Sequence, residues 1–145
     1  MSETELETNE EIARAYPERV ANERALDLLD ELLTEDFVEH GPLGDENGIP
    51  EARAGMEQLL GAFPDFTATV EDLVASGDTV AMRVTLRGTH EGPFAGIEAT
   101  GNTIEVQNMV FSRIEGGRIA ERWVVPDTLS MLQQLGVVDF EFQTP

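Results

Sequence analysis

The sequence predicts an α+β fold in which helices and antiparallel strands occupy separate parts of the chain. Helical periodicity covers residues 9–63, strand-like alternation covers residues 66–125, and a short helix follows residue 126. Such segregation places the helices beside an antiparallel sheet, which we expect to curl around them and leave a cavity. The 145 residues suit one domain over residues 9–145, preceded by a flexible acidic segment at residues 1–8.

The first predicted helix starts at Asn9 and carries an apolar stripe through Ile12 and Tyr16 to Val20. Pro17 should bend or interrupt it, because proline cannot donate the helical hydrogen bond. Tyr16 is the only tyrosine, and two interpretations stay open. It is either a core residue with its hydroxyl at the rim or a hydrogen-bond donor in a pocket.

Two further helices are predicted from leucine-rich stripes. The second stripe comprises Leu26, Leu29, Leu32 and Leu33, and the third, which begins near Pro50, comprises Met56, Leu59, Leu60 and Phe63. A polar loop over residues 43–48 separates the two helices. His40 ends the apolar segment that precedes this loop. It is either a structural hydrogen-bonding residue or part of a pocket wall that orients a substrate.

Two strands are predicted over residues 66–76 and 78–90, joined at Gly77-Asp78. One face of the second strand is apolar and is formed by Val80, Met82, Val84 and Leu86. His90 falls on this face if the alternation continues through Gly88. Residues 91–102 form a loop in which Phe94 is either an apolar lid over a pocket or an anchor on the core.

A long antiparallel hairpin is the best-defined predicted element. The run from Thr103 to Ile114 is rich in strand-forming residues, and Glu115-Gly116-Gly117 supplies the reversal. One face of this strand holds Gln107, Met109, Phe111 and Arg113, and the other holds Ile104, Val106, Asn108 and Val110. On the return strand, Ile119, Glu121, Trp123 and Val125 share a face. Glu121 on an otherwise apolar face needs a partner or a ligand.

The closing helix begins after Pro126 and ends before Gly136. Asp127 precedes its first turn and could cap it by accepting backbone N–H groups. Alternatively, Asp127 could lie at the mouth of the cavity that the hairpin lines. Both placements remain open from the sequence.

The charge is strongly one-sided, with 29 acidic residues, nine arginines and no lysine, for a formal net charge of −20. A nucleic acid or an anionic membrane needs a basic surface, so neither is an expected partner. Concentrated salt would screen the self-repulsion, and we therefore expect a salt-rich cytoplasm, as in a halophilic organism. The acidic N-terminus has no signal-peptide core and no run is long enough to span a membrane, which also favours a cytoplasmic protein.

Cysteine is absent, so disulfides, thiolate nucleophiles and cysteine-ligated metals are excluded. A metal site built from His40, His90 and a carboxylate is a weak alternative, because the histidines are 50 positions apart without ligand-type spacing.

The chain resembles the SnoaL-like polyketide cyclase, or ester cyclase, group of the nuclear transport factor 2-like superfamily. Three segments carry the resemblance: LDLLDELLTEDFVEHGP, GMEQLLGAFPDFTATVEDLVASGDTVAMRVTLRGTHEGPFAGIEATG and IEGGRIAERWVVPDTLSMLQQLG. The resemblance implies a cone-shaped α+β barrel with an internal pocket, usually a homodimer, that needs no metal or cofactor. Characterised cyclases of this group close a ring by an intramolecular aldol reaction, with one aspartate as general acid and base.

That aspartate lies near the last strand, and the resemblance places it at Asp127, with Glu121 as the second candidate. His40 and His90 correspond to positions where the group has pocket histidines, and we expect them to orient the substrate.

The remaining predicted substrate contacts are Tyr16, Phe94, an apolar wall of Met109, Phe111 and Trp123, and an amide from Gln107 or Asn108 that holds the enolate oxygen. An apolar pocket would raise the pKa of the catalytic carboxylate toward neutrality. The alternative is a non-catalytic small-molecule-binding or dimerisation module, with Asp127 only as a helix cap, Glu121 in solvent and a filled cavity.

Overall fold

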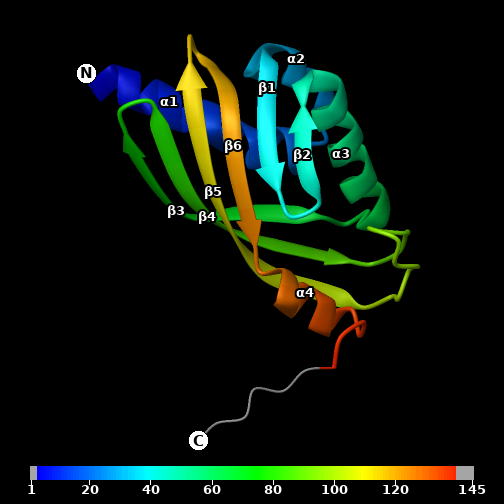
Figure 1. The fold of residues 1–145 in the computed structure, drawn as a ribbon. Helices are drawn as coiled ribbons and strands as arrows, with labels where there is room; N and C mark the ends of the chain where they lie inside the picture. The colour runs from blue at the N-terminus through cyan, green and yellow to red at the C-terminus, as the bar shows by residue number, and fades with distance from the viewer. Residues whose placement is uncertain (1–2, 140–145) are drawn as a thin grey trace, which may run out of the picture.

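The computed structural model describes residues 3–139, with side chains from residue 8 onward. Figure 1 shows a strongly curled sheet with helices against its concave side. The elements in chain order are α1 (Glu3–Ala15), the π-helix η1 (Tyr16–Ala21), the 3₁₀-helix η2 (Leu26–Leu28), α2 (Leu29–Leu32), β1 (Leu33–Gly41), β2 (Gly44–Asn47), α3 (Gly48–Ala62), β3 (Thr67–Ser76), β4 (Thr79–Thr89), β5 (Thr103–Glu115), β6 (Arg118–Pro126) and α4 (Thr128–Gln134).

The six strands form one mixed sheet in the order β2-β1-β6-β5-β4-β3. Strands β1 and β6 pair in parallel, whereas all other neighbours pair antiparallel. The α+β class and the curled sheet are confirmed, but the prediction of a purely antiparallel sheet missed β1 and β2. The residues of β1 were predicted as the end of the second helix and the apolar segment after it, and those of β2 as a polar loop. The strand β2 is only four residues long and has no apolar alternation that would indicate a strand.

The second predicted helix is much shorter than its leucine stripe suggested. Only one 3₁₀ turn and the four-residue α2 are helical, and the backbone becomes extended at Leu33. Leu29 and Leu33 are both fully buried, so the apolar residues were identified correctly as core residues. A leucine pattern that spans only one or two helical turns does not show whether the helix continues or gives way to a strand.

The first helix changes its winding at the predicted proline. Helix α1 begins at Glu3 rather than at the predicted Asn9, and η1 begins at Tyr16 with Pro17 in its first turn. The N–H of Asn22 donates to the carbonyl of Pro17 at 3.1 Å, which is the longer π-helical spacing. This turn buries Tyr16 and Val20 on the same side. Residues 1–2 of the predicted acidic segment and residues 140–145 of the predicted domain lie outside the described residues.

The core lies between the helices and the concave face of the sheet. Along β5, the side chains from Ile104 to Ile114 alternate between exposed and buried, and the buried set includes Val106, Asn108 and Val110. The predicted apolar face of β4 is also confirmed, because Val80 and Val84 are buried. No helix within residues 3–139 is long and apolar enough to cross a membrane.

A bulge in β6 changes which side chains enter this core. Arg113 pairs with Glu121 while Ile114 pairs with Ile119, so Ala120 is an extra residue on β6. Ile119 is therefore buried on the concave face, and the face reverses after Ala120. The prediction that Ile119 and Glu121 share a face is wrong for this reason. The bulge turns Arg122 inward, where its side chain is only 7% exposed.

Candidate functional site

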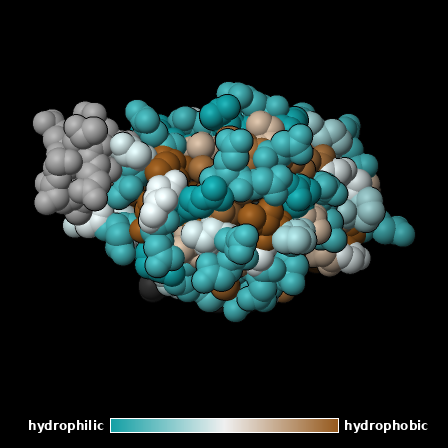
Figure 2. Space-filling view, turned by 90° about the horizontal axis from the view of Figure 1, so that it is seen from above, coloured by the Kyte–Doolittle hydropathy of each residue, from teal (hydrophilic) through white to brown (hydrophobic). Residues whose placement is uncertain are grey.

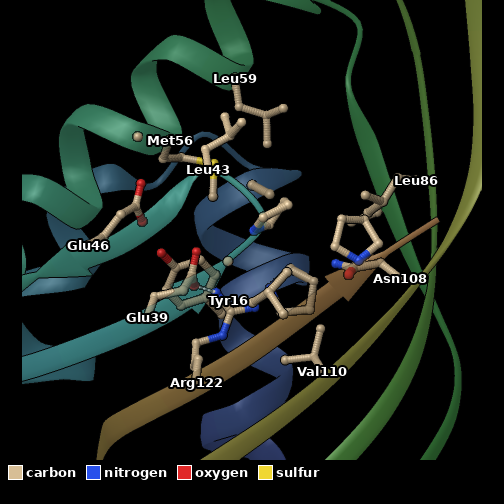
Figure 3. Close-up of a pocket in the computed structure, with 18 of the residues that line it drawn as sticks. Tyr16, Glu39, Leu43, Glu46, Met56, Leu59, Leu86, Asn108, Val110 and Arg122 are labelled. Carbon is tan, nitrogen blue, oxygen red and sulfur yellow. Dashed lines mark hydrogen bonds and ion pairs between the residues drawn. The ribbon is translucent and has the colours of Figure 1, made fainter. Parts of the chain in front are cut away.

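A cavity of about 390 Å³ lies between α3, η1 and the concave face of the sheet. This volume is within the range of small-molecule sites. Most of its wall is apolar and includes Met56, Leu59, Met82, Val84, Val110 and Val124. Figure 3 shows acidic and basic side chains gathered at one side of the cavity. The binding-module expectation of a filled cavity is therefore wrong.

The β1–β2 hairpin supplies two carboxylates to this cavity. Its register pairs Glu39 with Glu46 and His40 with Asp45. Since neighbouring residues in a strand point to opposite faces, Glu39 and Glu46 point inward, while His40 and Asp45 bond to each other on the outer face. Glu39 and Glu46 both line the cavity (Figure 3).

Arg122 brings a positive charge to the same place from the last strand. Its Nη1 donates a hydrogen bond to Glu39 Oε1, and this ion pair is largely buried. The guanidinium carbon lies 3.7 Å from the ring centroid of Tyr16, in cation–π contact. Burial, followed by the charge of Glu39, raises the pKa of Tyr16 above its ordinary value. Tyr16 therefore keeps its hydroxyl proton. Of the two interpretations left open for it, both agree in part, because Tyr16 is buried in the core and also lines the cavity.

Glu46 is the carboxyl group whose protonation is most altered. Burial raises the pKa of Glu46 from 4.5 to about 7, and the charge of Glu39 and a hydrogen bond with Glu39 add to this effect. Arg122 opposes it in part. Two close carboxylates with a single cation cannot both ionise freely, so the pair retains a proton up to neutral pH. A carboxyl group of this kind can exchange a proton with a substrate.

Asn108 adds an amide to the same cavity from β5. Its side chain is 7% exposed, and its Oδ1 has no hydrogen-bond partner among the described residues. A buried polar group without a partner is costly, and a ligand could satisfy it. Of the two predicted amides, Asn108 enters the cavity. Gln107 lies on the outer face, where it bonds to Arg83 and Thr85.

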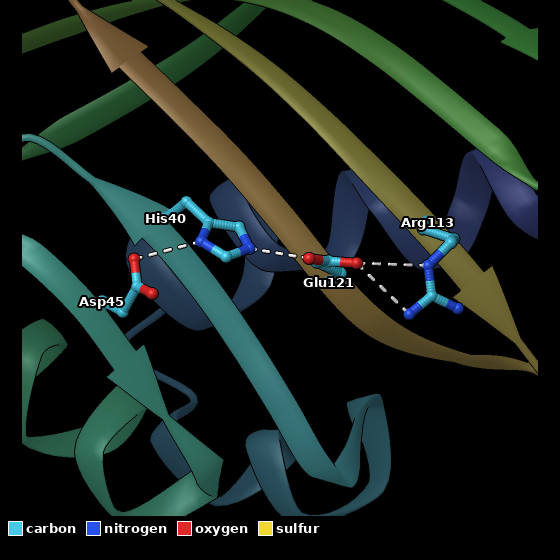
Figure 4. Close-up of polar contacts among 4 residues, drawn as sticks. All are labelled: His40, Asp45, Arg113 and Glu121. Atoms are coloured by element: carbon cyan, nitrogen blue, oxygen red, sulfur yellow. Dashed lines mark hydrogen bonds and ion pairs between the residues drawn. The ribbon is translucent and has the colours of Figure 1, made fainter.

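Two of the predicted catalytic residues lie on the outer face of the sheet. His40 Nε2 is 2.6 Å from Glu121 Oε2, and His40 Nδ1 is 3.0 Å from Asp45 Oδ1. Arg113 completes this network by donating to Glu121 at 3.4 Å (Figure 4). The hydrogen bond to Glu121, followed by that to Asp45, raises the pKa of His40, and His40 in turn lowers the pKa of Glu121. Glu121 is thus a paired carboxylate outside the pocket.

The predicted apolar wall also faces outward. Met109, Phe111 and Trp123 are 48%, 52% and 39% exposed on the convex face, and the Trp123 ring stacks on His40 at 5.5 Å. The prediction that these three residues line the pocket is wrong. The residues next to them in the strands point to the concave face instead. Val110 and Val124 occupy the wall instead.

Asp127 caps the last helix. Its Oδ1 accepts from the Ser130 backbone N–H at 3.1 Å and its Oδ2 accepts from the Ser130 hydroxyl at 2.7 Å. These bonds lower the pKa of Asp127, so it is an ionised, exposed carboxylate. Of the two placements left open by the sequence, the helix cap is the one observed, and Asp127 does not line the cavity.

His90 is buried, as the strand alternation indicated, but it does not line the cavity. Its Nδ1 accepts from the Thr100 backbone N–H at 3.2 Å, and its ring stacks on Phe63 at 5.4 Å. Phe94 meets the same Phe63 edge-on at 5.6 Å and also lines the cavity. Phe94 therefore combines both proposed roles, as a loop anchor and as part of the pocket wall.

The alternative of a metal site from the two histidines is contradicted by their positions. His40 lies on the outer face, whereas His90 is buried behind Phe63. Within residues 3–139, no group of three acidic or histidine side chains is arranged to hold a metal ion.

Sequence reasoning missed Glu39, Glu46 and Arg122. The one available signal was the period of two in a strand, which places Glu39 on the same face as the apolar Phe37. Nothing local marked Glu46, which lies in a polar four-residue strand, and Arg122 was placed on the wrong face by the bulge.

Known proteins match this chain over nearly its whole length. The family described as SnoaL-like polyketide cyclase matches residues 10–135, whereas no curated protein matches. TsrD from Streptomyces laurentii has 29% identity and a TM-score of 0.80, over 95% of this chain and 99% of TsrD.

Two further solved structures carry different functional names. IdmH from Streptomyces antibioticus, a candidate polyketide cyclase, has 36% identity and a TM-score of 0.76, over 89% of this chain and 99% of IdmH. AclR from Streptomyces galilaeus, a candidate hydroxylase, has 25% identity and a TM-score of 0.80, over 92% of this chain and 99% of AclR. With the family match spanning residues 10–135, the open cavity and the curled sheet have a common explanation: the chain belongs to the SnoaL-like polyketide cyclases.

Proposed function

We propose that this protein is a cofactor-independent cyclase or isomerase that acts on an enolisable carbonyl compound, with Glu46 as general acid and base. The observation that carries this proposal is the position of Glu46 beside Glu39 in a largely apolar cavity, where burial, followed by the charge of Glu39, raises the pKa of Glu46 to about 7. A group with a pKa near the working pH is suited to accept a proton and return it. Family membership and the cyclase name of IdmH support a small-molecule role of this type.

The proposed reaction is an intramolecular aldol closure. The ionised Glu46 carboxylate removes a proton from the carbon next to a carbonyl, which yields an enolate and a neutral Glu46. The enolate carbon then attacks a second carbonyl of the same molecule, so that a carbon–carbon bond and an alkoxide form. Neutral Glu46 returns its proton to the alkoxide, which restores the carboxylate and balances the cycle.

Neighbouring side chains would stabilise the enolate oxygen. Tyr16 keeps its proton because its pKa is raised, so its hydroxyl can donate to this oxygen, and Asn108 brings a side-chain amide N–H₂ donor to the same cavity. Both line the cavity, and a preorganised donor in a dry site stabilises developing negative charge more than one in water. Arg122 pairs with Glu39, and burial together with the nearby Glu39 charge raises the pKa of Glu46 to about 7, so that Glu46 can accept and return a proton near neutral pH.

Hydrogen exchange provides a direct test, because it does not require the natural substrate. A panel of β-keto esters and enolisable ketones is incubated with the protein in D₂O containing molar salt, and exchange at the α-carbon is followed by proton NMR. We expect Glu46→Gln to slow the exchange of any accepted compound by about 100-fold or more. Glu121→Gln is the matched control, since it makes the same change in a carboxylate outside the cavity.

Equal exchange rates in the wild type and in Glu46→Gln would refute the catalytic role. If ligands bind to both proteins without any exchange, the non-catalytic binding module becomes the better description. The structure offers some support to that alternative, because Asp127 is a helix cap, although the cavity is open.

We further propose that a second copy of the chain covers the outer face of the sheet. Met109, Phe111, Trp123 and Val125 are exposed there, and Val125 is 67% exposed. A clustered apolar surface of this kind marks an interaction site. The acidic groups on this face are matched by cations, as in Arg83–Asp72, Arg87–Glu105 and Arg113–Glu121. Because these carboxylates are paired with arginines, two chains of net charge −20 would repel each other less at this face than at the rest of the surface.

The acidic surface supports a salt-rich cytoplasm as the protein's environment. Figure 2 shows hydrophilic side chains over most of the visible face. With 29 acidic residues and nine arginines, most surface carboxylates have no cation to pair with, so dissolved salt must screen them.

A further inference from the structure

The carboxyl group of Glu46 lies directly against helix α3 at Gly55. A β-carbon built at position 55 would be 1.8 Å from Glu46 Oε2 and 2.8 Å from its carboxyl carbon. Atoms cannot approach that closely, so any side chain at this position would displace the carboxyl group. The three nearest atoms to such a β-carbon all belong to Glu46.

The backbone of α3 does not itself require glycine at this position. Gly55 lies in the middle of the 15-residue helix and is not among the residues with positive φ. Glycine is less favourable than alanine inside a helix. Its benefit here must therefore come from the space that it leaves, and Glu46 occupies that space.

We propose that Gly55 is a positioning residue: its bare helix surface holds the Glu46 carboxyl group against Glu39 inside the cavity. The role in turnover rests on the proposed function of Glu46, but the positioning can be measured without turnover. The two strands and the helix together define the site, since β1 supplies Glu39, β2 supplies Glu46, and α3 supplies the surface behind Glu46.

Four charged or titratable groups face Glu46 from the surrounding elements. Glu39 and Glu51 raise its pKa and Arg122 lowers it, while Tyr16 responds to its charge. Glu51 is fixed at the start of α3, where it accepts from the Asn47 N–H at 3.0 Å. Moving the Glu46 carboxyl group away from Glu39 would remove the hydrogen bond between them and increase its access to water. Both changes should lower its pKa.

The test compares Gly55→Ala with Gly61→Ala. Both substitutions replace a glycine of α3 by alanine, but a β-carbon at position 61 has no atom within 4 Å. The proteins are labelled with ¹³C at the glutamate side-chain carboxyl carbon, and each is titrated by NMR in molar salt. Glu46→Gln identifies the Glu46 signal. Thermal unfolding serves as the check on folding, and both alanine variants should be at least as stable as the wild type.

We expect the titration midpoint of Glu46 to fall by about one pH unit or more in Gly55→Ala and to stay unchanged in Gly61→Ala. An unchanged or higher midpoint in Gly55→Ala, or an equal shift in Gly61→Ala, would overturn the positioning role. α-Hydrogen exchange is measured on the same samples. A lowered midpoint with unaltered exchange would retain the positioning and refute the proposed function of Glu46, so the two failures can be distinguished.

Discussion

Glu39 and Glu46 are register partners across the β1–β2 hairpin, and both point into the same cavity. Arg122 is the one arginine that lines this cavity among the described residues, and it donates a hydrogen bond to Glu39. The second carboxyl group therefore has no cation of its own. Burial of Glu46, followed by the charge of Glu39, raises the pKa of Glu46 to about 7.

The raised pKa makes stability depend on pH in a defined window. Folded Glu46 binds its proton more tightly than the unfolded chain does, with pKa values of about 7 and 4.5. Its contribution is fully present below pH 4.5 and is lost as the pH rises to 7. We expect Glu46→Gln to gain about 1–2 kcal/mol relative to the wild type between these limits, after allowance for the solvent screening of a half-buried group. Urea unfolding at several pH values measures this, and a constant difference between the two proteins would contradict it.

Arg122 should be important for folding as well as for the site. Arg122→Met leaves Glu39 buried without its cation, and we expect a loss of about 3 kcal/mol in the free energy of unfolding. The double variant Arg122→Met with Glu39→Gln removes the uncompensated charge and should recover most of this loss. Urea unfolding in molar salt compares the three proteins. Equal stability of the single and double variants would show that the pair is not coupled.

The carboxylates outside the cavity should not affect turnover. We expect Asp127→Asn and Glu121→Gln to leave the rate of α-hydrogen exchange within about twofold of the wild type, because neither side chain lines the cavity. Asp127→Ala should instead lower the thermal midpoint slightly, since the helix loses its cap. A large loss of exchange in Glu121→Gln or in Asp127→Asn would contradict this expectation and would indicate that the substituted carboxylate takes part in catalysis.

The outer face of the sheet predicts the oligomeric state. We expect the wild type to sediment at twice the mass of one chain, and Phe111→Glu to sediment as a monomer, because it places a charge in the exposed apolar cluster. Val137→Glu is a matched control, since Val137 is 49% exposed and lies after α4, outside the strands of the sheet. A monomeric wild type, or dissociation by both variants, would contradict the proposed contact.

Salt should stabilise the folded chain. At a net charge of −20, screening reduces the repulsion among surface carboxylates, and the screening length falls to about 3 Å at 1 M salt. We expect the thermal midpoint to rise steadily from 0.1 M to 2 M potassium chloride. The steepest rise is expected at the low end, where charge repulsion is least screened. A midpoint that is independent of salt would argue against a salt-rich environment.

Several local patterns were sufficient to predict parts of this structure. The alternation in β4 and β5 correctly identified their buried faces, because a strand with one solvated face repeats every two residues. Asp127 before an apolar helical pattern indicated a cap, and Tyr16, left open as a core or a pocket residue, is buried in the core and also lines the cavity. In each case the evidence lies within one element.

The predicted site failed where the answer depended on distant partners. Trp123 was placed at a pocket from its position in the strand, and Glu121 from that position and from the family resemblance, but the bulge at Ala120 decides which side chains of β6 face the cavity. A one-residue shift reverses every later side chain in a strand. His40 was placed beside the correct position, since its neighbour Glu39 is the residue that enters the cavity.

The sequence by itself determined the α+β class, the family resemblance and the acidic surface, because these depend on periodicity, on extended sequence segments and on composition. Only the tertiary structure decided which carboxyl groups share the cavity. Glu39 and Glu46 meet through the register of the β1–β2 hairpin, and Arg122 joins them through the parallel pairing of β1 with β6. Gly55 of α3 leaves room for Glu46. A raised pKa arises from burial and from nearby charges, and both are properties of the assembled fold rather than of any one segment.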